Sequence, residues 1–291
     1  MQRKELLQAA AHLAGLYPLP APERMVRQDQ GASLGNESGQ SIDFRDFREY
    51  QLGDDVRRVD WRAFARTGQM YLKLFQKETS PIVEITLDTS ASMSICQGKE
   101  EAAIFLAMFL TETVRYTEGR PALTINGVRY AGRDIETALL ECQLNAQEDE
   151  DVIARGSSSI LKSNNLAAKP LRLWISDFLR TDGIAEDFRR TSQEAALFMP
   201  IMLLANSERN PDFRGKYRLT SAEFPKKTMD LAITQEDIEG YKRRLMRHET
   251  ELEENARRCG ADLLRITCPD DSLNKADCKQ MAQDMARQGS S

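Results

Sequence analysis

Downstream of Pro81, the chain alternates between short apolar runs and stretches with helical periodicity. The apolar runs predict five strands, and the periodic stretches predict five helices: strands at 82–87, 122–125, 171–175, 196–204 and 262–266, helices at 99–116, 135–146, 185–194, 235–258 and 273–286. Buried strands separated by helices are typical of a sheet that is covered on both faces. The pattern therefore predicts, over residues 80–291, an α/β domain with a doubly wound, Rossmann-like, mostly parallel sheet. A β-hairpin excursion is expected near 213–233.

Two segments precede this domain. Residues 1–41 begin with a stretch whose apolar side chains share one helical face, and a polar run rich in Gly, Ser, Gln and Asn follows. Charged and polar residues interrupt the apolar face, so the segment does not have the core of a signal peptide. We expect an N-terminal helix followed by a loop.

Residues 42–79 differ from the rest of the chain in composition. Seven of the chain's 20 aromatic residues occur here, with eight basic and seven acidic residues that nearly cancel. A nucleic-acid surface would need an excess of positive charge, which this segment lacks. We predict a small β-containing subdomain with a strand at 70–75, in which Arg–Asp pairs surround a core that includes Trp61 and Phe64.

Composition narrows the classes of function. The net charge is −5, and the pI near 5.4 argues against a general nucleic-acid-binding protein. The five cysteines are scattered along the chain, and no two of them form a CxxC motif. The longest apolar run, 102–110, is less than half as long as a membrane-spanning helix. Because the chain has only two histidines, a metal centre with several histidine ligands is excluded. We therefore expect a cytoplasmic protein without a membrane span.

The strongest chemical signal follows the first predicted strand of the sheet. Asp88, Ser90 and Ser92 supply one carboxylate and two hydroxyls at the carboxyl end of that strand, where open α/β sheets bind their ligands. These hard oxygen donors suit Mg²⁺ or another hard divalent cation. A second acid, Asp177, follows the predicted strand at 171–175. Ser and Asp after a strand also commonly cap the next helix, so metal binding and simple capping both remain open.

A resemblance to a known family rests on these residues and on a longer segment. The D-x-S-x-S run with a strand-terminal Asp resembles the metal-ion-dependent adhesion site of von Willebrand factor A-type domains. Upstream, the segments F44-R-D-F-R-E-Y50, G53-D-D55, D60-W61 and A65-R-T-G68 resemble the signature of a bacterial family, the domain of unknown function fifty-eight. In the tail, Y241-K-R-R-L245 and R257-R-C-G-A-D262 are similar to the last helix-to-strand step of that family.

This resemblance implies a fold, a site and a partner. The fold would be of the von Willebrand A type, and the site would hold Mg²⁺ through Asp88, Ser90, Ser92 and, by way of water, Asp177. Such sites usually add a Thr from a middle loop, for which Ser157, Ser158 or Ser159 is the nearest counterpart here. Members of the family are usually encoded beside MoxR-type AAA+ ATPases. The implied function is non-enzymatic: a metal-dependent protein-binding adaptor that works with such an ATPase in the assembly or maturation of a client complex.

Two other functions compete with the adaptor. The first is a Mg²⁺-dependent phosphatase of the haloacid-dehalogenase type, with Asp88 as nucleophile and Asp177 with Asp182 as metal ligands. That chemistry usually needs an acid two residues after the nucleophile, where this chain has Ser90. The second is an interaction scaffold that binds no ion. The identity of the client and the oligomeric state do not follow from the sequence.

Overall fold

The computed structural model describes residues 1–17, 42–51, 59–77, 81–144, 169–180, 183–222 and 228–289, without the side chains of 42–48 and 73–77. The chain divides into two compact units, Ser33–Ser80 and the remainder. The candidate loop at 157–159 and Asp182 lie outside the described residues.

The larger unit is built on a six-stranded sheet with the order β10-β7-β6-β3-β4-β5. Five strands run parallel, and the edge strand β5 pairs antiparallel with β4. The sheet strands are β3 (Ile82–Leu87), β4 (Arg120–Ile125), β5 (Val128–Ala131), β6 (Leu171–Ser176), β7 (Leu197–Ala205) and β10 (Leu264–Cys268). The prediction of a mostly parallel sheet is confirmed.

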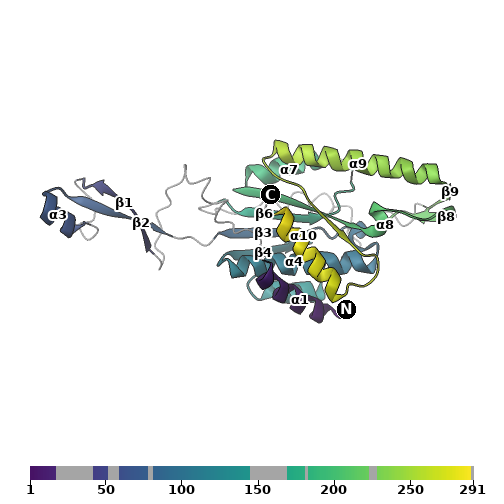
Figure 1. The fold of residues 1–291 in the computed structure, drawn as a ribbon, viewed down its shortest axis with the longest axis horizontal. Helices are drawn as coiled ribbons and strands as arrows, with labels where there is room; N and C mark the ends of the chain where they lie inside the picture. Colours follow the sequence, from purple (N-terminus) through teal and green to yellow (C-terminus); the bar gives the residue numbers. More distant parts are fainter. Residues whose placement is uncertain are drawn as a thin grey trace. The chain divides into compact units, whose positions relative to one another are not determined.

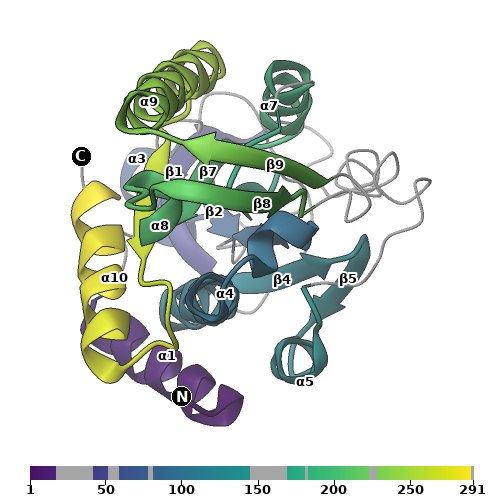
Figure 2. The same cartoon turned by 90° about the vertical axis from the view of Figure 1, so that its right-hand side faces the viewer.

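Helices cover both faces of this sheet (Figures 1 and 2). One face packs against α4 and α10, with α1 against α4 and α5 beside them, and the other face packs against α7 and α9. The helices are α1 (Arg3–Leu16), α4 (Gln97–Tyr116), α5 (Asp134–Glu141), α7 (Ile184–Gln193), α8 (Asn206–Arg209), α9 (Gln235–Arg258) and α10 (Lys275–Gln288), and η2 (Ala91–Ser94) is a 3-10 turn. The layered α/β architecture is consistent with a Rossmann-like fold.

Helix α4 is buried around most of its circumference. Its apolar run from Ala102 to Leu110 contacts the sheet on one side and the N-terminal helix α1 on the other. Helix α1 contributes five buried side chains to this contact: Leu6, Leu7, Ala10, Leu13 and Ala14. The apolar run that is too short for a membrane span is therefore the centre of the core. Among the helices of the described residues, none is long and apolar enough to cross a membrane.

Two strands outside the main sheet form the predicted hairpin excursion. Strand β8 (Gly215–Thr220) pairs antiparallel with β9 (Thr228–Ile233), and α9 begins directly afterwards. Thr234 caps α9 by accepting a hydrogen bond from the backbone N–H of Asp237, and the Asp237 carboxylate accepts in return. This reciprocal pair explains why the predicted start of the helix was correct.

The smaller unit contains β1 (Ile42–Glu49), α3 (Trp61–Thr67) and β2 (Tyr71–Lys77). The two strands pair antiparallel, which confirms a β-containing subdomain. The expected core position of Trp61 is wrong, because this side chain is 55% exposed. Val59 and Leu72 are buried here instead and form a β-bridge. Trp61 stacks edge-on against Phe64 within one turn of α3, so the aromatic pair lies along the helix surface.

Candidate functional site

The loop that follows β3 brings together three of the four predicted site residues. The backbone N–H of Ser90 donates to Asp88 Oδ1 at 2.9 Å, and the hydroxyl oxygens of Ser90 and Ser92 lie 3.1 Å apart. All three side chains are half-buried. Met93, which is fully buried, holds the 3-10 turn η2 against the core. The carboxylate and the two hydroxyls are therefore presented from one short turn.

A fourth oxygen reaches this cluster from the neighbouring strand. Strands β3 and β6 are adjacent and parallel, with Leu87 opposite Ile175, and the backbone N–H of Asp88 donates to the Ile175 carbonyl at 2.9 Å. The hydroxyl of Ser176 then donates to Asp88 Oδ2 at 2.5 Å. Sequence reasoning named the next residue, Asp177, and missed Ser176. The expected pairing of the two strands could have found it, because parallel register places the residue after Ile175 beside Asp88.

Asp177 lies at the same end of the sheet, and its carboxylate is engaged by other groups. The side chain is buried, with Oδ2 accepting a hydrogen bond from Lys99 Nζ at 2.9 Å and Oδ1 accepting one from the backbone N–H of Leu179 at 3.1 Å. Between them, Phe178 has a φ of 51° and donates its backbone N–H to the Ser176 hydroxyl at 3.0 Å. This tight loop directs Ser176 to Asp88 and Asp177 to Lys99.

Lys99 forms the centre of a buried ion triad. Its Nζ atom contacts Asp177 at 2.9 Å and Glu208 Oε1 at 2.7 Å, and the lysine is 0% exposed. Burial alone lowers the pKa of Lys99, but the attraction of the two carboxylates outweighs it and raises the pKa above its usual range. Burial raises the pKa of Glu208 although Lys99 opposes the shift. The only signal for this triad in the sequence is a lysine in the first turn of the helix, three residues before the apolar run 102–110.

The residues of the ion triad belong to different elements of the fold and connect them. Lys99 lies at the start of α4, and Glu208 belongs to α8, where its second oxygen accepts from the backbone N–H of Ala205 at 2.7 Å. The backbone carbonyl of Glu208 accepts a hydrogen bond from the Tyr241 hydroxyl of α9 at 2.7 Å. The triad therefore connects the loop after β6 with α4, α8 and α9.

Helix α4 approaches the loop before α10 closely enough to exclude a side chain. A Cβ at Gly98 would lie 2.0 Å from the carbonyl oxygen of Pro269, and the backbone N–H of Gly98 donates to the Asp270 carbonyl at 3.0 Å. This contact sets the position of the first turn of α4, which carries Lys99.

A second link runs from the loop to the turn between β4 and β5. The hydroxyl of Thr89 donates to Asn126 Oδ1, and Asn126 and Gly127 both have left-handed backbone conformations, with φ of 48° and 71°. An Asn-Gly pair of this kind favours a tight hairpin turn, which accounts for the edge strand β5 that the hydrophobic pattern did not predict.

The charge at this end of the sheet favours a cation. With all groups ionised, Asp88, Asp177 and Glu208 contribute three negative charges and Lys99 one positive charge, which leaves a net charge of −2 around the oxygen cluster. Hydroxyl and carboxylate oxygens are the ligands that hard divalent cations prefer. Within the described residues, however, no group of three or more His, Cys, Asp or Glu side chains could hold a metal ion. A cation here would depend on hydroxyls and water for most of its ligands.

The fold and the site together define an α/β protein with a polar oxygen cluster at the carboxyl ends of two adjacent parallel strands. A family model described as "Protein of unknown function DUF58" matches residues 46–251, more than two thirds of the chain, and the chain belongs to this family. Comparison with curated proteins and with solved structures found no match.

Proposed function

We propose that this protein is a non-enzymatic, divalent-metal-dependent protein-binding module. The observation that carries the proposal is the convergence of Asp88, Ser90, Ser92 and Ser176 on one point at the carboxyl ends of β3 and β6. Three of these four side chains are half-buried, so a cation could reach them from solvent.

In this proposal, Asp88, Ser90 and Ser92 supply direct ligands for Mg²⁺. Asp177 takes part through a water molecule, because its two oxygens already accept hydrogen bonds from Lys99 and from the backbone of Leu179. Neutral hydroxyls leave the ion electron-poor, and an octahedral ion with so few protein ligands keeps open positions. A carboxylate from a partner protein would fill one of these positions.

The strand order supports a finer assignment of the fold. We propose that the sheet is of the von Willebrand A type, since the D-x-S-x-S run follows a central strand and one antiparallel strand, β5, closes an edge. The resemblance that suggests this assignment also suggests the partner, a MoxR-type AAA+ ATPase with a client complex in the cytoplasm.

A metal-free scaffold is the second candidate function, and one observation favours it. Both oxygens of Asp88 already accept hydrogen bonds, from Ser90 and Ser176, and the hydroxyls of Ser90 and Ser92 bond to each other. The cluster is therefore satisfied without an ion. In that case Asp88 would stabilise the loop and would have no direct part in partner binding.

The test is a calorimetric titration of the protein, first with Mg²⁺ and then with the candidate ATPase. The metal-dependent module predicts that Mg²⁺ binds wild-type protein, that Asp88→Asn abolishes this binding, and that EDTA weakens ATPase binding. The matched control is Asp262→Asn, which removes an exposed carboxylate before β10, at the opposite end of the sheet from the oxygen cluster. Equal partner affinity in Mg²⁺, in EDTA and for Asp88→Asn would favour the metal-free scaffold.

A further inference from the structure

The first half of α9 carries an exposed group of positive charges that are not held in close ion pairs with the acids that the structure describes. Lys242, Arg243, Arg244 and Arg247 are all exposed, and none of them forms an ion pair with any residue that the structure describes. By contrast, two arginines in the last turn of the same helix pair with acids four residues earlier: Arg257 with Glu253 and Arg258 with Glu254. The whole chain is acidic, with a net charge of −5, so the basic turn stands out from its surroundings.

Two of these arginines converge on a bare stretch of backbone. A Cβ at Gly240 would lie 3.5 Å from Arg244 Nη1 and 3.9 Å from Arg243 Nη2, and apart from its chain neighbours and the backbone of the helix no other described group comes within 4 Å of it. Both guanidinium groups therefore reach back over the preceding turn, as helical side chains generally do. The hydrogen bonds from Thr234 lower the pKa of the Asp237 carboxyl, and the nearby positive charge of Arg244 acts in the same direction.

This arrangement forms a small notch suited to a carboxylate. Two guanidinium groups close to one point repel each other, and an anion between them would relieve the repulsion with charge-assisted hydrogen bonds. A glycine within an exposed helix costs about 1 kcal/mol relative to alanine, and the described side-chain atoms within 4 Å of its missing Cβ are these two guanidinium nitrogens. A ligand group that approaches the backbone at Gly240 accounts for both features.

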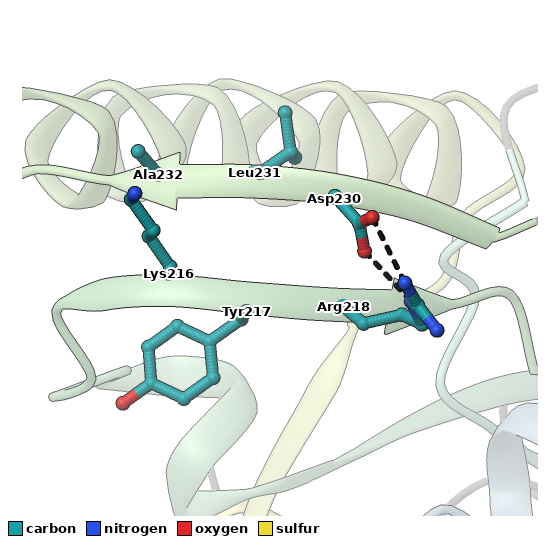
Figure 3. A pocket seen from close by; sticks show the side chains of 6 residues that line it. All are labelled: Lys216, Tyr217, Arg218, Asp230, Leu231 and Ala232. Atoms are coloured by element: carbon teal, nitrogen blue, oxygen red, sulfur yellow. Dashed lines mark hydrogen bonds and ion pairs between the residues drawn. The ribbon is translucent and has the colours of Figure 1, made fainter.

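The hairpin beside α9 adds apolar surface. Strand β9 leads directly into α9, so the hairpin lies at the start of that helix (Figures 1 and 2). The cross-strand pairs Tyr217–Leu231 and Leu219–Met229 are 40–61% exposed, which is unusual for four large side chains in one short hairpin. Figure 3 shows a pocket of about 490 Å³ along the two strands, with Lys216 at one end and the Arg218–Asp230 pair crossing between them.

The hairpin also offers unpaired backbone. Strands β8 and β9 form a sheet of only two strands among the described residues, so each has an edge at which an extended segment could pair. The Tyr241 hydroxyl fixes the neighbouring turn of α9 to the Glu208 carbonyl at 2.7 Å. The basic turn is therefore held in place by the core and does not depend on a ligand for its position.

We propose that the first half of α9 and the β8–β9 hairpin together bind an acidic segment of a partner protein, one that combines carboxylate with aliphatic side chains. Gly240, Arg243 and Arg244 receive a carboxylate, and the exposed side chains of the hairpin contact the aliphatic groups. Free phosphate would not use the apolar surface. Apart from the aromatic pair Phe213–Tyr217 at one end, the large exposed side chains of the hairpin are aliphatic, which favours a protein segment over stacked bases. This proposal does not depend on the cation site.

The proposal is tested with a fluorescein-labelled peptide made of repeated Asp-Leu-Glu-Ser units. Its binding to the protein is measured by fluorescence anisotropy. The double variant Arg243→Glu/Arg244→Glu should weaken binding by about tenfold or more, because it removes two charge-assisted contacts. The matched control, Arg257→Glu/Arg258→Glu, makes the same charge change on the same helix. It lies about 20 Å away at 1.5 Å per residue, beyond the screening length of roughly 8 Å at physiological salt, and should leave binding nearly unchanged.

Two further variants separate the notch from the hairpin. Gly240→Leu should weaken binding by filling the notch while leaving the melting temperature unchanged or raised. Leu219→Ser/Leu231→Ser should weaken binding of the leucine-containing peptide but not of a peptide in which Ser replaces Leu. Leu219 and Leu231 are both 40% exposed, so circular dichroism should show a folded double variant. Affinities should be the same in Mg²⁺ and in EDTA, which distinguishes this surface from the cation site.

Several results would overturn the proposal. An equal loss in the Arg257/Arg258 control would show general charge attraction. Full displacement of the peptide by inorganic phosphate would show an anion site only, and tighter binding of a DNA oligonucleotide that is lost in Arg243→Glu/Arg244→Glu would show a nucleic-acid surface. A change in sedimentation for that variant, without a loss of peptide binding, would show an interface between two copies of this chain.

Discussion

Replacing Lys99 by methionine tests the buried ion triad. Lys99 is 0% exposed and lies 2.9 Å from Asp177 and 2.7 Å from Glu208. At an effective dielectric constant of about 20, each contact is worth roughly 6 kcal/mol before the cost of removing the ions from water. Methionine fills much of the same volume but leaves two buried carboxylates without a counter-ion. Breaking buried pairs in this way destabilises proteins by about 3–5 kcal/mol, and we expect a loss of that size at neutral pH.

The loss should depend on pH in a definite direction. Burial already raises the pKa of Glu208 with Lys99 present, and removal of the ammonium group raises it further. A carboxyl whose pKa is higher in the folded state destabilises the fold above its ordinary pKa and ceases to do so once it is protonated. The penalty of Lys99→Met should therefore be smaller at pH 5 than at pH 7, because the lower pH favours protonation of the Glu208 carboxylate.

Urea unfolding of wild-type protein and Lys99→Met at both pH values measures the effect. The triple variant Lys99→Met/Asp177→Asn/Glu208→Gln should recover most of the lost stability, because it removes the uncompensated charges as well. Lys279→Met, which replaces an exposed lysine of α10, is the control and should change little. A loss below about 1 kcal/mol, or an equal loss at both pH values, would refute the reasoning.

Three further predictions concern stability. Gly98→Ala should lower the free energy of unfolding by about 1–3 kcal/mol, because its Cβ would lie 2.0 Å from the Pro269 carbonyl oxygen and the first turn of α4 must shift. An unchanged midpoint of urea unfolding would contradict this close approach. Gly240→Ala should stabilise the protein by about 1 kcal/mol, and a lower melting temperature would show that the helix needs glycine there. Burial raises the pKa of Cys268 to about 12 and that of Cys278 to about 11, so ionisation of these thiols in the unfolded chain should lower stability as pH rises from about 9. Thermal unfolding at increasing pH should show this decline, and Cys278→Ala should reduce it; a constant melting temperature would argue against burial of the thiols.

The sheet and its helices could be predicted because their signals are local and periodic. Strand β3 lies at 82–87 and α9 at 235–258, as predicted, since a buried strand and a capped amphipathic helix each mark their own boundaries. Strand β5 was missed because its side chains are mostly exposed and it has no apolar run. Its clearest signal is the Asn126–Gly127 turn, which hydrophobic patterning does not detect.

The candidate site could be predicted only in part, for a different reason. Asp88, Ser90 and Ser92 belong to one turn, so spacing alone brings them together. Ser176 and Asp177 are adjacent in sequence, yet one reaches Asp88 and the other Lys99. That division depends on strand register and on the backbone conformation of the loop, which residue types do not specify. The exposure of Trp61 also does not follow from residue type, because a small unit has little core in which an aromatic side chain can be buried.

The most direct test of the central claim is a crystal structure of the protein grown with Mn²⁺ in place of Mg²⁺, with anomalous diffraction used to locate the ion. We expect an anomalous peak within ligand distance of the Asp88 carboxylate and of the Ser90 and Ser92 hydroxyls, with water on the side of Asp177. A well-ordered loop with no peak at that position, in crystals where Mn²⁺ is bound elsewhere or not at all, would contradict it.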